Sequence, residues 1–213
     1  MTRMSFYKEN IIKYIISKDS KILVLGADKL DQSLFEELGY TNVIYSNYND
    51  KEEKTKEHYL NILMQDIKLE DNTFEYCVAH ACVHHSSKPH NSILEMCRVA
   101  SKGVIIIEAN DCLLTRLACK LKISEEYEYS AIKANVDSGG VDNSIIPNYV
   151  YRWTEREINK LLKSFEPNKE HQINFRYSHD IKYINNSFLK FVFKIFFKIF
   201  KKQQNLMSIY INI

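Results

Sequence analysis

Short apolar segments alternate with helix-patterned segments along this chain, and this alternation constrains the fold more than any other feature. The runs KILVLGA (21–27), FEYCVAH (74–80) and VIIIEA (104–109) are largely apolar, as is typical of strands buried on both faces of a parallel sheet. Further strands are predicted at 42–47, 61–66, 173–184 and 205–213. Helices are predicted at 5–18, 31–40, 88–100, 112–122, 154–165 and 188–202. The alternation indicates an open, doubly wound α/β sheet with helices on both faces.

Several local signals predict where these elements begin and end. Ser5 is expected to cap the first helix, and Thr154 with Glu157 forms an expected capping box. Gly39 is expected to end the helix at 31–40, and the sequence SKG at 101–103 is expected to form a turn. The polar and aromatic stretch 122–153 reads as an insertion into the alternating pattern.

Size and composition favour one globular domain over 1–213. A chain of 213 residues buries one substantial core, and neither internal repeats nor a linker divides it. The formal charge is +2, from 29 Lys and Arg against 27 Asp and Glu, so no global field favours nucleic acid as a partner. The five cysteines form no CxxC pair, which predicts reduced thiols in a cytoplasmic protein.

The segment FLKFVFKIFFKIFKK, residues 188–202, is the most apolar part of the chain. Lysines at 190, 194, 198 and 202 interrupt it at helical spacing, which predicts an amphipathic helix in place of a membrane span. Such a helix can cover one face of the sheet, lie on a membrane surface as a peripheral contact, or bind RNA phosphates.

In a doubly wound sheet, ligands bind beyond the carboxyl ends of the strands, near the point where strand order reverses. The residues just after the predicted strands are therefore the candidate binding residues. They are Gly26, Ala27, Asp28, Ser46, Asn47, Gln65, Asp66, His80, Ala81 and Glu108 to Asp111.

The stretch from Gln65 to Asp111 resembles the middle of class I S-adenosylmethionine-dependent methyltransferases of the type 11 branch. The matching features are Asp66, DNTFE at 71–75, HH at 84–85, the E-x-x-R-V motif at 95–99, and Gly103. The register needs no gap over about fifty residues. The resemblance implies a Rossmann-like sheet of seven strands whose last strand is antiparallel, and S-adenosylmethionine (SAM) as cofactor.

The resemblance also implies which residues bind the cofactor. They are Gly26, Ala27, Asp28, Ser46, Asn47, Gln65, Asp66, Ile67, His80 and Ala81, with Asp66 at the adenine and His80 at the methionine end. The chain departs from the family in two places: Asp28 and Leu30 replace later glycines of the loop, and Ser46 or Asn47 replaces an acidic residue that binds the ribose. A non-catalytic binding protein with a degenerate cofactor loop is therefore the alternative to an enzyme.

Four histidines in HACVHHSSKPH, residues 80–90, allow three interpretations. His80 and His84 have the spacing of an HxxxH zinc motif, but the glutamate that follows the first histidine of that motif is replaced by Ala81, so no metal is expected. In an acid–base interpretation, His85 accepts the proton of an alcohol acceptor. In a structural interpretation, His84 and His85 only fill the loop before the next helix.

Other residues point to the methyl acceptor. Asp111 could act as a base, bind sugar hydroxyls or cap the next helix. Tyr149, Tyr151 and Arg152 could line an acceptor pocket, whereas Trp153 is expected to pack against the sheet. The stretch VDSGGVDNSIIPNYVYRWTEREI is similar to methyltransferases of bacterial surface-polysaccharide clusters. That similarity implies a small polar acceptor, such as an oxygen of a nucleotide-linked sugar or phosphoryl group.

Overall fold

The computed structural model describes residues 2–49, 58–135, 138–179 and 187–213, with backbone alone for 187–191. Its strands are β1 (Ile22–Leu25), β2 (Val43–Asn47), β3 (Tyr59–Asn61), β4 (Phe74–His80), β5 (Ala100–Ala109), β6 (Gln172–Ser178) and β7 (Leu206–Asn212). Its α-helices are α1 (Arg3–Tyr14), α2 (Lys29–Glu37), α3 (Pro89–Val99), α4 (Leu113–Lys120), α5 (Tyr129–Ala134), α6 (Glu155–Phe165) and α7 (Ser187–Ile199). Short 3-10 turns are η2 (Val83–His85), η3 (Val141–Asn143) and η4 (Lys201–Gln203).

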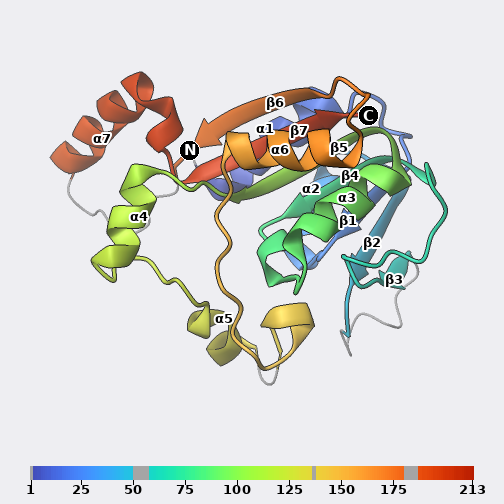
Figure 1. The fold of residues 1–213 in the computed structure, drawn as a ribbon, viewed down its shortest axis with the longest axis horizontal. Coiled ribbons are helices and arrows are strands. Elements are labelled where there is room, and N and C mark those ends of the chain that lie inside the picture. Colours follow the sequence, from blue (N-terminus) through green and yellow to red (C-terminus); the bar gives the residue numbers. More distant parts are fainter. Residues whose placement is uncertain (1, 50–57, 136–137, 180–186) are drawn as a thin grey trace.

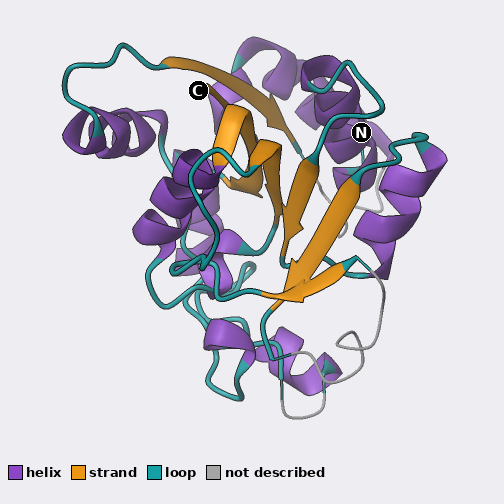
Figure 2. Ribbon diagram, turned by 90° about the vertical axis from the view of Figure 1, so that its right-hand side faces the viewer, coloured by secondary structure: helices purple, strands orange, loops and turns teal. Residues whose placement is uncertain are grey.

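The strands form one twisted sheet in the order β3-β2-β1-β4-β5-β7-β6 (Figures 1 and 2). The strands β1 to β5 pair in parallel, and β7 runs antiparallel to both of its neighbours, β5 and β6. From β1 the chain builds outward first through β2 and β3, then through β4 and β5 on the other side. The order therefore reverses between β1 and β4. The predicted fold class, a mostly parallel seven-stranded sheet with an antiparallel last strand, is confirmed.

Side-chain alternation in the strands gives the sheet two buried faces. Ile22 and Val24 of β1 join a core cluster with α1 and α2, whereas Leu23 and Leu25 join a cluster with α3 and α6. Figure 1 shows α3 and α6 in front of the sheet, and α4 and α7 to the left of these helices. Trp153 is 0% exposed within the second cluster, so its predicted packing role is confirmed.

Four local predictions are wrong. Thr2, and not Ser5, caps α1, since its hydroxyl accepts the N–H of Ser5. The predicted turn at 101–103 lies inside β5, which begins at Ala100 and pairs with both β4 and β7. The third strand lies at 59–61, just before most of the predicted 61–66 segment. Cys112, and not Asp111, caps α4.

Two further predictions are only partly met. At α6, Thr154 accepts the Glu157 N–H, while the Glu157 carboxylate turns to His90 and Tyr151. The predicted strand at 173–184 ends at Ser178, and its residues 180–184 lie outside the described part of the chain. Among the described residues, none of the helices has both the length and the apolar character that a bilayer span requires.

Candidate functional site

A cavity of about 1290 Å³ lies at the carboxyl ends of β1, β2 and β4. Residues that follow these strands line it, and the insertion closes it with the segments 131–135 and 138–143. Seven predicted site residues line the cavity: Gly26, Ala27, Asp28, Asn47, Gln65, Ala81 and His85. The cavity therefore occupies the position where a doubly wound sheet binds its ligands.

Gly26 ends β1 in a conformation that other residues rarely adopt. Its φ is +61°, and a Cβ atom at this position would lie 2.5 Å from the Cβ of Cys82 and 2.8 Å from its Sγ. The Cys82 thiol donates to the carbonyl of Leu25 at 3.2 Å, which holds the two loops together. Tyr59 donates to the carbonyl of Ala27 at 2.5 Å from the edge strand β3. The first loop is therefore fixed by one contact from the loop after β4 and one from β3.

Asp28, at a position where relatives have glycine, caps α2. Its carboxylate accepts the N–H groups of Leu30 and Asp31, and the Asp31 carboxylate accepts the Asp28 N–H at 3.0 Å. Burial and the neighbouring Asp31 charge raise the pKa of Asp28. The loop thus replaces glycine flexibility with a reciprocal cap at the start of a helix.

The remaining predicted cofactor residues do not line this cavity. Ser46 is fully buried within β2, with its hydroxyl 3.4 Å from the carbonyl of Val24. The Asp66 side chain is 53% exposed and pairs with Lys68 at 2.6 Å. Ile67 is buried in the core. Of Gly26, Asp66 and His80, which follow three different strands, only Gly26 lines the cavity.

His80 faces the opposite side of the sheet from the α3 layer. Its ring stacks on Tyr7 of α1 at 4.3 Å between centroids, and its Nδ1 lies 3.8 Å from the Asp31 carboxylate. Burial favours a higher pKa for Asp31, but the nearby His80 ring and the hydrogen bond from the Asp28 N–H lower the pKa below its ordinary value. The structure therefore gives His80 a place in the packing of α1 and α2.

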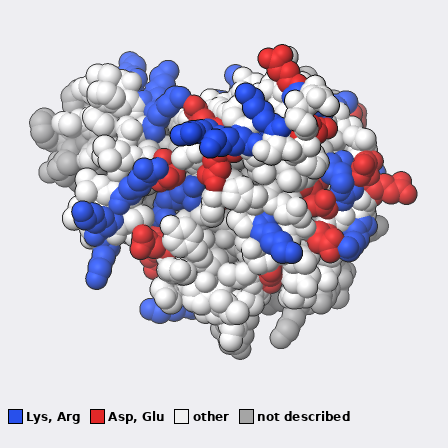
Figure 3. Space-filling model, viewed as in Figure 1, with Lys and Arg blue, Asp and Glu red and all other residues white. Residues whose placement is uncertain are grey.

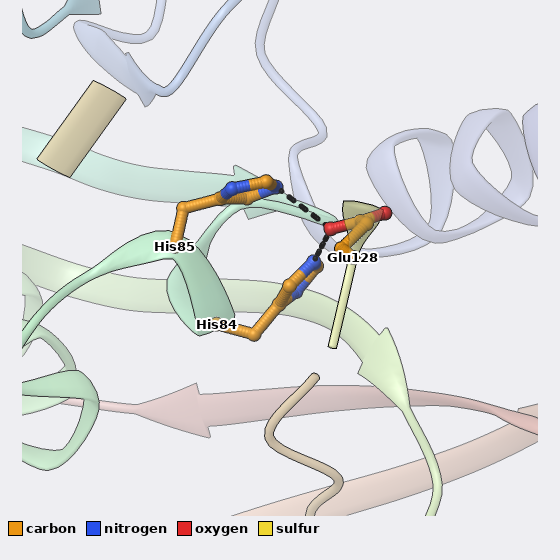
Figure 4. Close-up of side chains that lie close together, drawn as sticks. All are labelled: His84, His85 and Glu128. Carbon is orange, nitrogen blue, oxygen red and sulfur yellow. Dashed lines mark hydrogen bonds and ion pairs between the residues drawn. The ribbon is translucent and has the colours of Figure 1, made fainter. Parts of the chain in front are cut away.

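His84 lies in a buried charged cluster between β4 and the insertion (Figure 4). Its Nδ1 is 2.7 Å from Glu108, at the end of β5, and its Nε2 is 3.3 Å from Glu128. Burial alone would lower the pKa of His84, but the two carboxylates outweigh it and raise the pKa to about 9. The other carboxylate oxygen of Glu108 accepts the N–H of Val83 at 2.8 Å. The hydrogen bond from His84 is the main cause that lowers the pKa of Glu128 to about 2.

His85 stands beside this cluster and also lines the cavity. Its Nε2 lies 3.4 Å from the same Glu128 oxygen that meets His84. Burial and the neighbouring His84 charge lower the pKa of His85. The adjacent histidines thus have different environments: His84 is 7% exposed and ion-paired, while the side chain of His85 is 26% exposed at the cavity wall.

A second cavity of about 880 Å³ collects the predicted acceptor residues. Asp111, Tyr149, Tyr151 and Arg152 all line it, together with residues of α4 and α6. It shares no lining residue with the first cavity. The two cavities lie near the ends of neighbouring strands. Ala81, which follows β4, lines the first cavity, and Asp111, which follows β5, lines the second.

Hydrogen bonds within the protein already engage several groups of this second cavity. The Asp111 carboxylate forms a bidentate pair with Arg116 at 2.6 and 2.8 Å. The guanidinium of Arg152 donates to backbone carbonyls of the insertion and to Ser124. Basic and acidic side chains are interspersed over this face of the molecule (Figure 3).

The E-x-x-R-V motif fixes the loop between β3 and β4. Glu95 accepts the N–H of Ile67 at 2.9 Å and pairs with Arg98 at 2.8 Å. Arg98 in turn donates to the carbonyls of Ile67 and Leu69 and to Asp71. The guanidinium of Arg98 is the main cause that lowers the pKa of Glu95. This motif therefore positions the loop that carries Gln65 into the cavity.

Sequence reasoning missed Glu128 and Asn148, which complete the His84 cluster from the insertion. Asn148 is 1% exposed and donates to the Glu128 carboxylate at 3.2 Å. Neither residue stands next to a strand or in a recognisable motif, so the sequence carried no signal for either. Only the fold of the insertion brings them to the histidines.

This sheet order, with a cavity at the switch point, is the fold of class I SAM-dependent methyltransferases. Residues 34–107 match the family model described as a methyltransferase domain. No curated protein matches the chain at the significance required. The family match supports SAM as the cofactor.

Solved structures with this fold match almost the whole chain. A SAM-dependent methyltransferase from Thermotoga maritima has 12% identity and a TM-score of 0.56, over 99% of this chain and 89% of its own. One from Archaeoglobus fulgidus has 11% identity and a TM-score of 0.58, over 99% and 94%. The plantazolicin methyltransferase BpumL, in complex with SAH, has 12% identity and a TM-score of 0.56, over 99% and 82%. At these identities the likeness establishes the fold.

Proposed function

We propose that the protein is a SAM-dependent methyltransferase that acts on an oxygen of a small polar acceptor. The observation that carries this proposal is the cavity at the ends of β1, β2 and β4, lined by Gly26, Asn47, Gln65 and His85. Its volume of about 1290 Å³ exceeds the roughly 300–1,000 Å³ of an ordinary small-molecule pocket. The space therefore suits a cofactor together with a small acceptor.

The residues of the cavity fit the cofactor. A Cβ atom at position 26 would fill the close approach between the loops, so the glycine keeps backbone atoms accessible at the end of β1. Asn47, the last residue of β2, lines the cavity where the ribose hydroxyls would lie, and Gln65 presents the β3–β4 loop to the adenine. SAM supplies the methyl group, and its sulfur keeps the electron pair of the broken bond, which gives SAH.

His85 is the histidine that faces the acceptor in this proposal. It stands on the cavity wall beside Glu128, where it can receive the proton that the acceptor hydroxyl loses. The remaining rate enhancement comes from alignment of the acceptor behind the methyl group and from exclusion of water. Residues of the insertion line part of the cavity wall, which supports the exclusion of water.

The acceptor class rests on the second cavity, where the part of the acceptor remote from the methylated oxygen would lie, and on the resemblance of the insertion. Tyr149 and Tyr151 offer aromatic faces to a sugar ring, and Arg156 and Lys160 add exposed positive charge to the same cavity. We propose a nucleotide-linked sugar, a phosphoryl group or a similar precursor of a surface polysaccharide such as capsule. A panel of such compounds, with SAM labelled in its methyl group, identifies the acceptor by transfer of label.

Isothermal titration with SAM and SAH tests the cofactor. We expect saturable binding of both, and no heat at millimolar ligand would favour the non-catalytic alternative. His85→Asn is expected to slow turnover at unchanged SAH affinity. Full activity of this variant would contradict the role of His85. His171→Asn, which replaces a histidine outside both cavities, serves as the matched control.

We also propose that α7 gives the protein a peripheral contact with the inner face of the cytoplasmic membrane. Val192, Ile195, Ile199 and Phe200 are each 45% exposed or more, and the exposed Lys194 interrupts this apolar surface. The side chains of 188–191 lie outside the described part of the chain. Flotation with anionic vesicles is expected to carry the protein upward, and Ile195→Glu to reduce this. Absence of flotation at low salt would contradict the contact.

A further inference from the structure

We propose that His84, His85 and Glu128 form a binding site for a divalent transition-metal ion, of which Zn²⁺ fits best. His80 and His84 have the spacing of a metal-binding pair, although the sequence predicts no metal there. The structure instead places His80 against Tyr7 and brings two adjacent histidines to one glutamate of the insertion. Figure 4 shows the three side chains pointing toward one another.

The two distances from the histidines to the Glu128 oxygen suit a shared ion. The candidate ligand atoms all lie within 4.8 Å of one another. Glu128 Oε2 is 3.3 Å from His84 Nε2 and 3.4 Å from His85 Nε2. Two ligands that each lie about 2.0–2.2 Å from a tetrahedral ion are separated by roughly 3.3–3.6 Å. The contact of His84 Nε2 with Glu128 is also a long hydrogen bond, whereas His84 Nδ1 contacts Glu108 at 2.7 Å.

Glu108 supplies the support that a histidine ligand usually has. It is 1% exposed at the end of β5, and its contact with His84 Nδ1 directs the opposite ring nitrogen toward Glu128. Histidine ligands of metals commonly donate their second ring N–H to such a carboxylate, which fixes the tautomer and the ring orientation. The cluster also holds two carboxylates, the buried Glu108 and the partly exposed Glu128, and an added cation would offset their charge.

Asn148 holds the Glu128 carboxylate in place beside the two histidines. It is 1% exposed, and its Oδ1 is buried without a hydrogen-bond partner among the described residues. Its Nδ2 lies 3.2 Å from the same Glu128 oxygen.

Two imidazoles and a carboxylate select the class of ion. Imidazole favours zinc and other late first-row ions over Mg²⁺ and Ca²⁺, which prefer sets of oxygen ligands. Three protein ligands leave a fourth position of a tetrahedral ion for water or substrate. His85 lines the first cavity, so the ion would lie next to the wall of that cavity.

The consequence for the reaction rests on the proposed function. An ion on His85 Nε2 occupies the lone pair that would otherwise accept a proton, and it lowers the pKa of an oxygen bound to it. Metal binding itself does not depend on methyl transfer. It is therefore measured without SAM, and SAH binding is measured separately, so that failure of one proposal is distinguishable from failure of the other.

The test is titration of the full chain, freed of any affinity tag and of metal, with Zn²⁺ by calorimetry and with Co²⁺ by visible absorption. We expect one ion per chain and an intense Co²⁺ band typical of tetrahedral coordination. Glu128→Gln and His85→Asn should each weaken binding by at least about tenfold. Both side chains are partly exposed, at 29% and 26%, so both variants should fold, which unchanged far-UV circular dichroism would verify.

Glu166→Gln is the matched control for this experiment. Glu166 Oε2 lies 3.3 Å from His171 Nε2, the same separation as in the cluster, but the pair does not belong to a group of three ligands among the described residues. We expect this variant to bind like the original chain. The proposal is overturned if neither ion binds, or if Glu128→Gln and His85→Asn bind as tightly as the Glu166→Gln control.

Discussion

Replacement of Gly26 by alanine tests the geometry of the cofactor loop most directly. The φ of +61° costs an L-residue roughly 1–2 kcal/mol. The new Cβ would also lie 2.5 Å from Cys82 Cβ and 2.8 Å from its Sγ, so the η2 turn must shift, at a cost of about 1–3 kcal/mol. We therefore expect Gly26→Ala to lower the free energy of unfolding by about 2–5 kcal/mol and to weaken SAH binding.

Two substitutions of Cys82 separate these contributions in urea unfolding. Cys82→Ala keeps the Cβ atom, which is the nearer contact, so it should not rescue Gly26→Ala. Cys82→Gly removes that atom and should recover the cost of overlap, about 1–3 kcal/mol, while the cost of the positive φ stays. A free energy of unfolding of Gly26→Ala within about 0.5 kcal/mol of that of the original chain would refute this account. Equal rescue by both Cys82 substitutions would also refute it.

Three further predictions follow from buried or ion-paired groups. Arg98 holds the pKa of Glu95 below its ordinary value, so this pair stabilises the chain above pH about 4.3, and its contribution is lost as the pH falls through the pKa of folded Glu95. Between pH 7 and 3, the urea midpoint of the original chain should therefore fall more steeply than that of Glu95→Gln. Parallel profiles of the two proteins would contradict this. Trp153→Ala should cost about 3–5 kcal/mol in the same assay, because the side chain is 0% exposed; an unchanged midpoint would refute its role in the core. Gln65→Ala should weaken SAH binding more than Asp66→Ala, since only Gln65 lines the cavity; calorimetry that gives equal affinities would argue against this placement.

The fold was predictable because its strongest signals are local. β4 has the predicted bounds, and the apolar run 104–109 lies within β5, since burial on both faces needs continuous apolar residues. The residues before that run were assigned to a turn because they are polar or small. In the structure Gly103 is a strand residue, and a Cβ atom there would lie 2.7 Å from the Tyr210 ring of β7. The glycine therefore marks a close cross-strand contact, which the sequence does not distinguish from a turn.

The sequence predicts which loops border the candidate site, but it does not always predict where their side chains lie. Alternation along β4 could have corrected His80: Val78 packs with α1 and α2, and a residue two positions later faces the same side. The sequence singles out the pair at 84–85 but does not show that the two side chains have different environments, because the carboxylates beside them come from β5 and from the insertion. Such partners depend on tertiary structure.

The insertion gives the site its shape, since it reaches the loops that follow β2, β3 and β4. Asn143 donates to the carbonyl of Tyr48 after β2, and Asp142 accepts from Gln65 after β3. Glu128 meets both histidines after β4. Three separate points of attachment fix the insertion over the carboxyl edge of the sheet. A loop with a single glycine can therefore still border a defined cavity, because the opposite wall does not depend on that loop.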